Sequence, residues 1–220
     1  MIDPKYIDAT LLNPRATAGE VDAFCRDAIA CGVACVMVNP CFVPLCKSLT
    51  QGTDVVVGTV IDFPLGAGTV ADKVAQTVEA VKNGAHDIDL VAGLHYANAG
   101  DYEGLEQTVR AVRSHVPNIL KVILETSELT DEQIVASVQA CARAGADFVK
   151  TSTGFVGSGA TEHAVRLMKQ TVDVFNTATG ANVRVKASGG IRTVEQARAM
   201  IAAGAERIGA SAYRAMTTEV

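Results

Sequence analysis

The sequence predicts an α/β fold, a single-domain TIM (β/α)8 barrel that takes in residues 1–220. Eight short apolar segments alternate with stretches of helical periodicity, and no Pro- or Ser-rich linker divides the chain. Strands that alternate with helices pair in parallel through helical crossovers, and eight such units fit this barrel. A doubly wound open sheet would show the same alternation and is the alternative fold. The expected strands are roughly residues 6–10, 34–38, 55–63, 87–92, 120–125, 147–152, 183–188 and 207–211.

The ends of the expected helices repeat one pattern. KNGAHDIDLV, RAGADFVKTS and AAGAERIGAS each place a Gly-Ala pair shortly before a strand, and ACGVACVMV is a looser fourth copy. Glycine is the residue that most readily adopts the left-handed conformation in which many helices end. The pattern therefore predicts four helix ends, at Gly32, Gly84, Gly145 and Gly204.

The starts of the helices repeat as well. Threonine followed three residues later by Glu or Gln fits the capping box, which begins a helix. The pairs are Thr17–Glu20, Thr130–Gln133 and Thr193–Gln196, with Thr69–Asp72 as a near match. After two of these starts, apolar residues recur at helical spacing: Val70, Val74, Val78 and Val81 in one helix, and Ile134, Val138 and Cys141 in another.

Charge and composition argue against several classes of function. The net charge is -5 and the basic residues are scattered, so neither a nucleic-acid surface nor a polybasic membrane patch is expected. No apolar run of about 18 residues predicts a membrane span, and the start MIDPKYIDATLL lacks the apolar core of a signal peptide. The six cysteines form no C-x-x-C pair, which together with the missing signal predicts reduced thiols and a cytoplasmic protein.

No metal or cofactor is expected. The four histidines are far apart in sequence and show no zinc-binding spacing. Ligands that converge from distant strands would leave no such spacing, so a metal site is disfavoured rather than excluded.

Three lysines are expected to point into the barrel. In LKVILE, DFVKTS and RVKASGG the alternation of a strand turns Lys121, Lys150 and Lys186 inward, and in DIDLV it turns Asp89 inward. A strand lysine is usually paired with a carboxylate, but three exceed what Asp89 and Glu125 can neutralise. The surplus positive charge predicts either a bound anion or a lysine with a lowered pKa. In this fold such a site lies at the carboxyl ends of the strands.

Small residues follow the last two expected strands. Gly189 and Gly190 come after the seventh, and Gly209 and Ser211 lie at the end of the eighth. Backbone N–H groups of such loops can approach an anion, and the corresponding loops of TIM barrels commonly hold phosphate. The alternative is that these turns simply need glycine.

The motifs resemble those of the deoxyribose-phosphate aldolase family. KVILET, GADFVKTSTGF, VKASGGIR and RIGAS occur in this order, with DATLL near the start and DIDLV in the middle, so the resemblance covers nearly the whole chain. It implies a TIM barrel that reversibly cleaves 2-deoxy-D-ribose 5-phosphate to acetaldehyde and D-glyceraldehyde 3-phosphate, without a cofactor. The implied partners are therefore a phosphorylated small sugar and short aldehydes, with homodimer and homotetramer both left open. The alternatives are another phosphate-binding barrel, such as an isomerase, and a sugar-phosphate-binding barrel without activity.

The resemblance also implies a role for individual residues. Lys150 would form a Schiff base with the substrate, and Asp89 would relay protons. The positive charge of Lys186 would favour the neutral form of Lys150. The lysine must be neutral to attack a carbonyl, so its pKa is expected to fall from about 10.4 to about 7. Further substrate-binding positions would be Asp8, Thr10, Lys121, Gly154, Gly189, Gly190, Gly209 and Ser211.

Five departures from the family pattern bear on rate and specificity. Met37 stands where members usually carry cysteine near the substrate, Ala9 where many carry histidine, and Asp62 where glycine is frequent. Ala212 replaces a serine that commonly helps to hold phosphate. The sequence closes on MTTEV, without the C-terminal tyrosine that some members use in proton transfer.

Overall fold

Eight parallel strands form a closed barrel. A computed structural model describes residues 1–217 of the protein. The strands pair in sequence order, and β8 pairs with β1 to close the sheet, so the open-sheet alternative is wrong. The strands are β1 Ile7–Leu11, β2 Cys35–Val38, β3 Val56–Ile61, β4 Asp87–Val91, β5 Ile119–Ile123, β6 Phe148–Lys150, β7 Arg184–Ser188 and β8 Arg207–Ala210.

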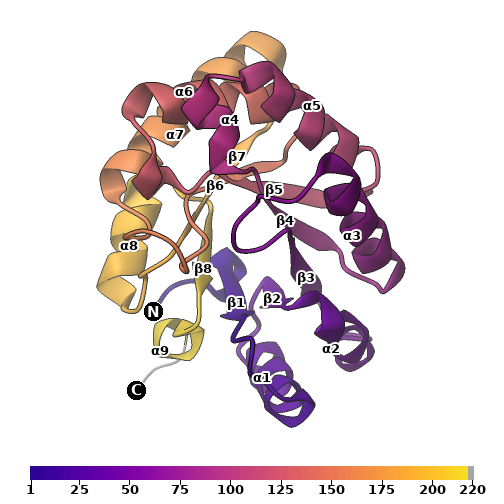
Figure 1. The fold of residues 1–220 in the computed structure, drawn as a ribbon. Coiled ribbons are helices and arrows are strands. Elements are labelled where there is room, and N and C mark those ends of the chain that lie inside the picture. Colours follow the sequence, from indigo (N-terminus) through magenta and orange to yellow (C-terminus); the bar gives the residue numbers. More distant parts are fainter. Residues whose placement is uncertain (218–220) are drawn as a thin grey trace.

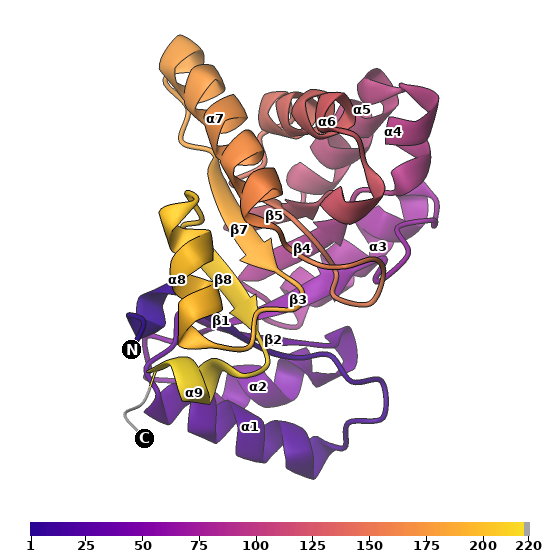
Figure 2. The same cartoon turned by 90° about the vertical axis from the view of Figure 1, so that its left-hand side faces the viewer.

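Helices surround the strands on the outside of the barrel (Figures 1 and 2). They are α1 Ala18–Ala30, α2 Val43–Leu49, α3 Val70–Lys82, α4 Leu94–Ala99, α5 Tyr102–Arg113, α6 Asp131–Arg143, α7 Glu162–Thr179, α8 Val194–Ala202 and α9 Tyr213–Thr217. Short 3-10 helices span Pro4–Tyr6, Pro40–Phe42 and Thr126–Glu128. Within residues 1–217, no helix has the length and apolar character needed to cross a membrane.

The predicted helix boundaries are confirmed. Thr17, Thr69, Thr130 and Thr193 each accept from a backbone N–H three residues on and complete a capping box. The four expected glycines follow helices α1, α3, α6 and α8 with positive φ: Gly32, Gly84, Gly145 and Gly204. These signals set where each helix starts and stops, and so fix how each strand enters the barrel.

The buried face of α3 matches only in part the one that its valines suggest, since Val74 and Val81 are half-buried and pack against the core. Val70 and Val78 are exposed, whereas Lys73, Thr77 and Ala80 are the buried residues. The Lys73 ammonium donates to the Asp62 carboxylate and, at 2.9 Å, to the Gly66 carbonyl, so this side of the helix is polar. In α6 the expected apolar face is confirmed, since Ile134, Val138 and Cys141 are all buried.

The molecule has two kinds of interior. A large apolar cluster fills the space between the strands and the helices, and it includes Ala9, Val36, Val122 and Val185. Inside the barrel a smaller apolar cluster comprises Leu12, Cys35, Met37 and Val60. The barrel interior also holds a layer of charged side chains, and this charged layer lies beneath the candidate site.

Candidate active site

Three lysines enter the barrel interior from neighbouring strands, as the alternation predicts. Lys121 lies on β5, Lys150 ends β6 and Lys186 lies on β7, with Lys150 and Lys186 opposite each other in the strand register. Lys121 and Lys186 are fully buried, and Lys150 is 3% exposed. The three therefore share one desolvated layer, and their carboxylate partners differ.

Asp89 on β4 binds all three ammonium groups. Its Oδ2 lies 2.8 Å from Lys150 Nζ and 2.8 Å from Lys186 Nζ. Its Oδ1 lies 3.2 Å from Lys121 Nζ. One carboxylate oxygen thus bridges Lys150 and Lys186.

Two further aspartates balance the remaining lysines. Asp8 on β1 lies 2.5 Å from Lys186 Nζ and 2.7 Å from Arg207, and Asp87 on β4 lies 2.5 Å from Lys121 Nζ. Sequence reasoning counted Asp89 and Glu125 as the available acids and so overstated the surplus of positive charge. Asp87 alternates with Asp89 along β4, and this spacing was the signal for its inward position. With Lys150 neutral, three carboxylates face Lys121, Lys186 and Arg207, and the buried charges balance.

Lys150 has a lowered pKa. Burial is the largest cause, the Asp89 carboxylate opposes it, and the nearby charge of Lys186 assists it, which together bring the pKa of Lys150 to about 8. At pH 7 about a tenth of the amine is then neutral, against less than about 0.1% for an unperturbed lysine. Desolvation, rather than Lys186 alone, makes Lys150 available as a nucleophile.

Asp89 stays ionised. Burial alone would raise the pKa of its carboxyl group, but Lys121, Lys150 and Lys186 together hold the pKa well below its usual range. Lys121 behaves in the opposite way to Lys150: burial works to lower its pKa, yet Asp8, Asp87 and Asp89 raise it well above the ordinary value. Lys121 is therefore a fixed cation, and Lys150 is the lysine that can lose its proton.

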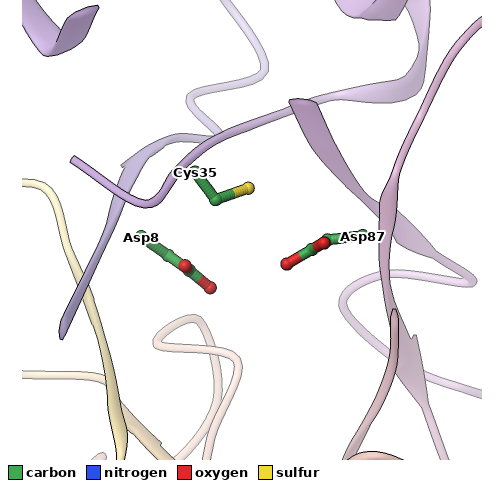
Figure 3. A group of neighbouring side chains, drawn as sticks. All are labelled: Asp8, Cys35 and Asp87. Atoms are coloured by element: carbon green, nitrogen blue, oxygen red, sulfur yellow. The ribbon is translucent and has the colours of Figure 1, made fainter. Parts of the chain in front are cut away.

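Asp8, Cys35 and Asp87 point toward one another inside the barrel (Figure 3). Their potential ligand atoms all lie within 4.8 Å of one another. Lys121 Nζ, however, lies 2.5 Å from Asp87 and 3.5 Å from Asp8. Burial and the neighbouring carboxylates also raise the pKa of Cys35 well above its usual value, which keeps the thiol protonated. These residues do not fit a metal, because an ammonium group already supplies the positive charge.

A cavity of about 440 Å³ opens above Lys150 at the carboxyl ends of the strands. Seven of the eleven predicted site residues line it: Thr10, Lys150, Gly154, Gly189, Gly190, Gly209 and Ser211. The other four lie outside this lining, in the charged layer: Asp8, Asp89, Lys121 and Lys186. Lys150 is thus the member of the charged layer that reaches the cavity.

Two of the cavity glycines are required by close approaches. Gly189 has φ +90°, and a Cβ there would lie 2.9 Å from Gly159 Cα. A Cβ at Gly209 would lie 2.9 Å from Ser188 Cβ and 3.2 Å from Lys186 Cε. Gly209 therefore leaves room for the Lys186 side chain as well as for whatever enters the cavity.

Most of the departures from the family pattern lie away from the cavity. Met37 is fully buried in the small apolar cluster inside the barrel, and Ala9 packs between the barrel and the helices. Asp62 holds Lys73 and the backbone N–H of Gly68. Ala212 is half-buried next to Ser211. The remaining departure, at the end of the chain, falls partly on residues 218–220, outside the described residues.

Sequence reasoning missed how Glu125 is used. Strand β5 ends at Ile123, and Glu125 has a left-handed backbone with φ +58°, so the alternation that grouped it with Lys121 no longer applies. Its carboxylate accepts hydrogen bonds from Thr153 instead. No simple sequence signal marks this contact, because the two residues lie 28 positions apart on different loops.

The chain matches known aldolases along most of its length. The model of the DeoC/LacD family aldolase matches residues 4–218. The deoxyribose-phosphate aldolase of Thermoanaerobacter pseudethanolicus is 51% identical over 212 residues, covering 94% of this chain and 92% of the relative. That of Brevibacillus brevis is 46% identical over 215 residues, with 97% and 94% covered.

Solved structures agree with this assignment. A putative deoxyribose-phosphate aldolase from Coccidioides immitis superposes with a TM-score of 0.91 at 43% identity, covering 95% of this chain and 81% of that one. The tetrameric deoxyribose phosphate aldolase from Aeropyrum pernix gives 0.87 at 31% identity, with 97% and 88% covered. The chain therefore belongs to the DeoC/LacD family of aldolases.

Proposed function

We propose that this protein catalyses the reversible aldol cleavage of 2-deoxy-D-ribose 5-phosphate to acetaldehyde and D-glyceraldehyde 3-phosphate through a Schiff base on Lys150. The observation that carries the proposal is that Lys150 lines the cavity and has a pKa lowered to about 8. The names of the relatives reported above support the choice of substrate.

Lys150 supplies the electron sink. Its neutral Nζ adds to the aldehyde carbon of the open-chain sugar, and loss of water gives a protonated imine. Removal of the proton from the C3 hydroxyl then breaks the C2–C3 bond, which releases glyceraldehyde 3-phosphate and leaves an enamine. Protonation of the enamine carbon and hydrolysis release acetaldehyde and regenerate the amine of Lys150.

Asp89 and Lys186 transfer protons and stabilise positive charge beneath the imine. The shared oxygen of Asp89 lies 2.8 Å from both lysines and can carry a proton between them. Because Asp89 is held ionised, it also stabilises the positive charge of the imine after Lys150 has reacted. Proton transfers to the substrate itself pass through water in the cavity.

The phosphate end of the substrate is assigned to the glycine-rich side of the cavity. Gly189, Gly190 and Ser211 line that side, together with Gly154 from the loop after β6. Binding the phosphate there fixes the far end of the sugar, so that its aldehyde carbon meets Lys150. The roles of Asp8 and Lys121 become those of counterions that keep the layer balanced, since neither lines the cavity.

An isomerase reading of the same barrel has less support. Such a reaction needs a carboxylate base facing the substrate, and no Asp or Glu among the described residues that line the cavity provides one. A binding protein without activity would retain the cavity but would have no use for a lysine with a lowered pKa.

Trapping the imine tests the proposal. Acetaldehyde and borohydride should leave a reduced adduct that peptide mass mapping places on Lys150, and Lys150→Leu should lose both the adduct and the cleavage activity. An adduct on Lys121 or Lys186 in the unmodified protein would contradict the assignment, and cleavage without any adduct would contradict the imine mechanism.

Location and assembly are the remaining parts of the proposal. We propose a cytoplasmic protein that binds neither nucleic acid nor membranes, as the composition predicts. Assembly into a homodimer or homotetramer is proposed on the precedent of the tetrameric Aeropyrum pernix relative. Light scattering of the purified chain would decide between these two states.

A further inference from the structure

Glu125 is a buried carboxylate that the lysine layer does not use. It follows the end of β5, its side chain is 3% exposed, and its φ of +58° lies in a region that few residues other than glycine adopt. Strained backbone of this kind is maintained only where the surrounding structure enforces it, and it is concentrated at functional sites.

A single oxygen of Glu125 organises the start of the loop after β6. Its Oε2 accepts from the Thr153 backbone N–H at 3.1 Å and from the Thr153 hydroxyl at 2.5 Å. The same hydroxyl oxygen accepts from the backbone N–H groups of Phe155 at 3.1 Å and Val156 at 3.3 Å. The carboxylate therefore fixes Thr153 directly and Phe155 and Val156 through it.

This loop, residues 151–161, forms one wall of the cavity. Thr153, Gly154 and Phe155 line the cavity, and further along the loop the Ala160 N–H donates to the Gly189 carbonyl at 3.0 Å. The position of the loop thus affects the glycine-rich side, to which the phosphate is assigned. On its outer side, Phe155 packs edge-to-face on Phe63, with ring centroids 5.1 Å apart.

The environment of Glu125 differs from that of the three aspartates. No cation among residues 1–217 forms an ion pair with it, and its Oε1 has no hydrogen-bond partner there. Burial raises the pKa of this carboxyl group, although the hydrogen bonds from Thr153 and, to a smaller extent, the charge of Lys150 oppose the shift. It also borders a second cavity of about 70 Å³, which has room for water. A carboxylate that is buried without an ion-pair partner, and with one oxygen lacking a hydrogen bond, is costly and therefore indicates a specific role.

We propose that Glu125 is a positioning residue: through Thr153 it holds the loop of residues 151–161 where that loop shapes the phosphate side of the cavity. It does not touch the reacting atoms. The kinetic consequence rests on the proposed function, because it concerns the binding of a sugar phosphate. The structural consequence, a loop held by one carboxylate, stands independently of the reaction.

Substitutions at Glu125 separate positioning from catalysis. Glu125→Met removes both carboxylate oxygens, and we expect KM for deoxyribose 5-phosphate to rise about tenfold. The value of kcat and the yield of the trapped acetaldehyde adduct should stay within about threefold of those of the unmodified protein. Glu125→Gln keeps one acceptor oxygen and should restore most of the loss. Glu132→Met makes the same change at an exposed site on α6 and should have no effect. If Gln is as damaging as Met, or if kcat falls with KM unchanged, the positioning role is wrong.

A double-mutant cycle tests the path through Thr153. Thr153→Val removes the hydroxyl with little change of shape and should raise KM to a similar extent. Because both residues act on the same loop, the double variant Glu125→Met, Thr153→Val should be no worse than the more damaging single variant. Losses that multiply would show that Glu125 acts by another route.

Amide hydrogen exchange tests the loop without any turnover. The Phe155 and Val156 amides should exchange faster in Glu125→Met and Thr153→Val than in the unmodified chain. Unchanged exchange of these amides in Thr153→Val would overturn the inference, even if Glu125→Met does not fold. If the unmodified chain cleaves no deoxyribose 5-phosphate, the proposed function fails, and the exchange result alone decides the role of Glu125.

Discussion

Three lysines on adjacent strands of one barrel differ in charge because their neighbours differ. Lys121 is surrounded by Asp8, Asp87 and Asp89, which keep it charged. Lys150 shares its aspartate with Lys186 and is the lysine that reaches the cavity. The chemistry of Lys150 therefore comes from its buried position and from a shared counterion.

Removing Lys186 should move the activity to higher pH. Lys186→Leu removes the positive charge that disfavours protonation of Lys150, while the carboxylate of Asp89, which favours it, stays in place. The pKa of Lys150 should therefore rise above about 8. Activity at pH 7 should fall sharply, and the residual activity should increase toward alkaline pH, with the slow adduct still on Lys150. Lys82→Leu, at an exposed site, serves as the control in the same pH–rate measurement. A profile without an alkaline shift would mean that Lys186 acts other than through charge.

Ser211 should matter only for phosphorylated substrate. Ser211 lines the cavity on the glycine-rich side, and loss of a hydrogen bond to a charged phosphate weakens binding by about 1.5 kcal/mol. Ser211→Ala should raise KM for deoxyribose 5-phosphate about tenfold and leave the slow turnover of unphosphorylated deoxyribose nearly unchanged. Equal losses on the two substrates would place the phosphate elsewhere.

Met37 should affect stability more than mechanism. It is fully buried beside Gly58 and does not line the cavity. Met37→Cys leaves unfilled volume, so the free energy of unfolding should fall by about 2 kcal/mol, while activity stays within about tenfold. Urea denaturation and initial rates measure the two effects. Conversion of an inert protein into an active one would contradict the proposed function of the unmodified chain.

The charged residues inside the barrel could be predicted only where a strand carries them, whereas the cavity glycines and Ser211 were predicted from the loops that follow strands. Lys150, Lys186 and Asp89 obey the alternation of β6, β7 and β4, so their inward positions follow from the sequence. Glu125 does not, because β5 ends before it and the chain turns. The partnership of Asp8 with Lys186 joins positions 178 residues apart, and sequence periodicity carries no information about such a contact.

At the level of elements, helix boundaries were predictable and one helix face was not. The capping boxes and the glycines that follow the helices are local signals, and the structure confirms them. The buried face of α3 depends on a partner in another element. Asp62, in the loop after β3, binds Lys73 and turns that polar side of the helix inward.

The Asp62–Lys73 pair should be important for stability. The Lys73 side chain is 1% exposed and that of Asp62 is 15% exposed, so removal of the carboxylate leaves a buried ammonium group without its counterion. Asp62→Asn should lower the free energy of unfolding by about 3 kcal/mol. Asn suits the backbone of Asp62, whose φ is +51°, so the substitution mainly removes charge.

A second variant separates the buried charge from the loop contacts. The double variant Asp62→Asn, Lys73→Met leaves no buried ammonium group at this position. Its loss in free energy of unfolding, measured by urea denaturation, should be clearly smaller than that of Asp62→Asn alone. Equal losses in the two variants would show that the hydrogen bond from Gly68 to Asp62, rather than the charge of Lys73, stabilises this loop.

At the scale of the whole molecule, barrel closure assembles the site. The pairing of β8 with β1 brings Arg207 to within 2.7 Å of Asp8, and Asp8 in turn contacts Lys186. Opposite charges from the first and last strands are thus joined across the seam of the barrel. An open sheet would separate these charges, so the balanced layer under Lys150 depends on the complete fold.

Lys150, the proposed Schiff-base lysine, should make the whole protein less stable at neutral pH. Folding lowers the pKa of Lys150 from 10.5 to about 8, so between these values the unfolded chain binds more protons than the folded one. The destabilisation is therefore fully present below about pH 8 and vanishes as the pH rises past 10.5. It corresponds to about 3 kcal/mol. A residue kept for activity at the expense of stability would behave in this way.

Lys150→Met tests this trade-off directly. The variant should be inactive and, at pH 7, more stable than the unmodified protein by about 2–3 kcal/mol in urea denaturation. The difference between the two proteins should shrink as the pH is raised toward 10.5, because Lys150 is then neutral in both the folded and the unfolded chain. Lysines outside the charged layer titrate alike in both proteins and cancel in this comparison. A variant that is less stable than the unmodified protein at pH 7 would show that the folded barrel does not disfavour the charge of Lys150, and the source of its nucleophilicity would have to lie elsewhere.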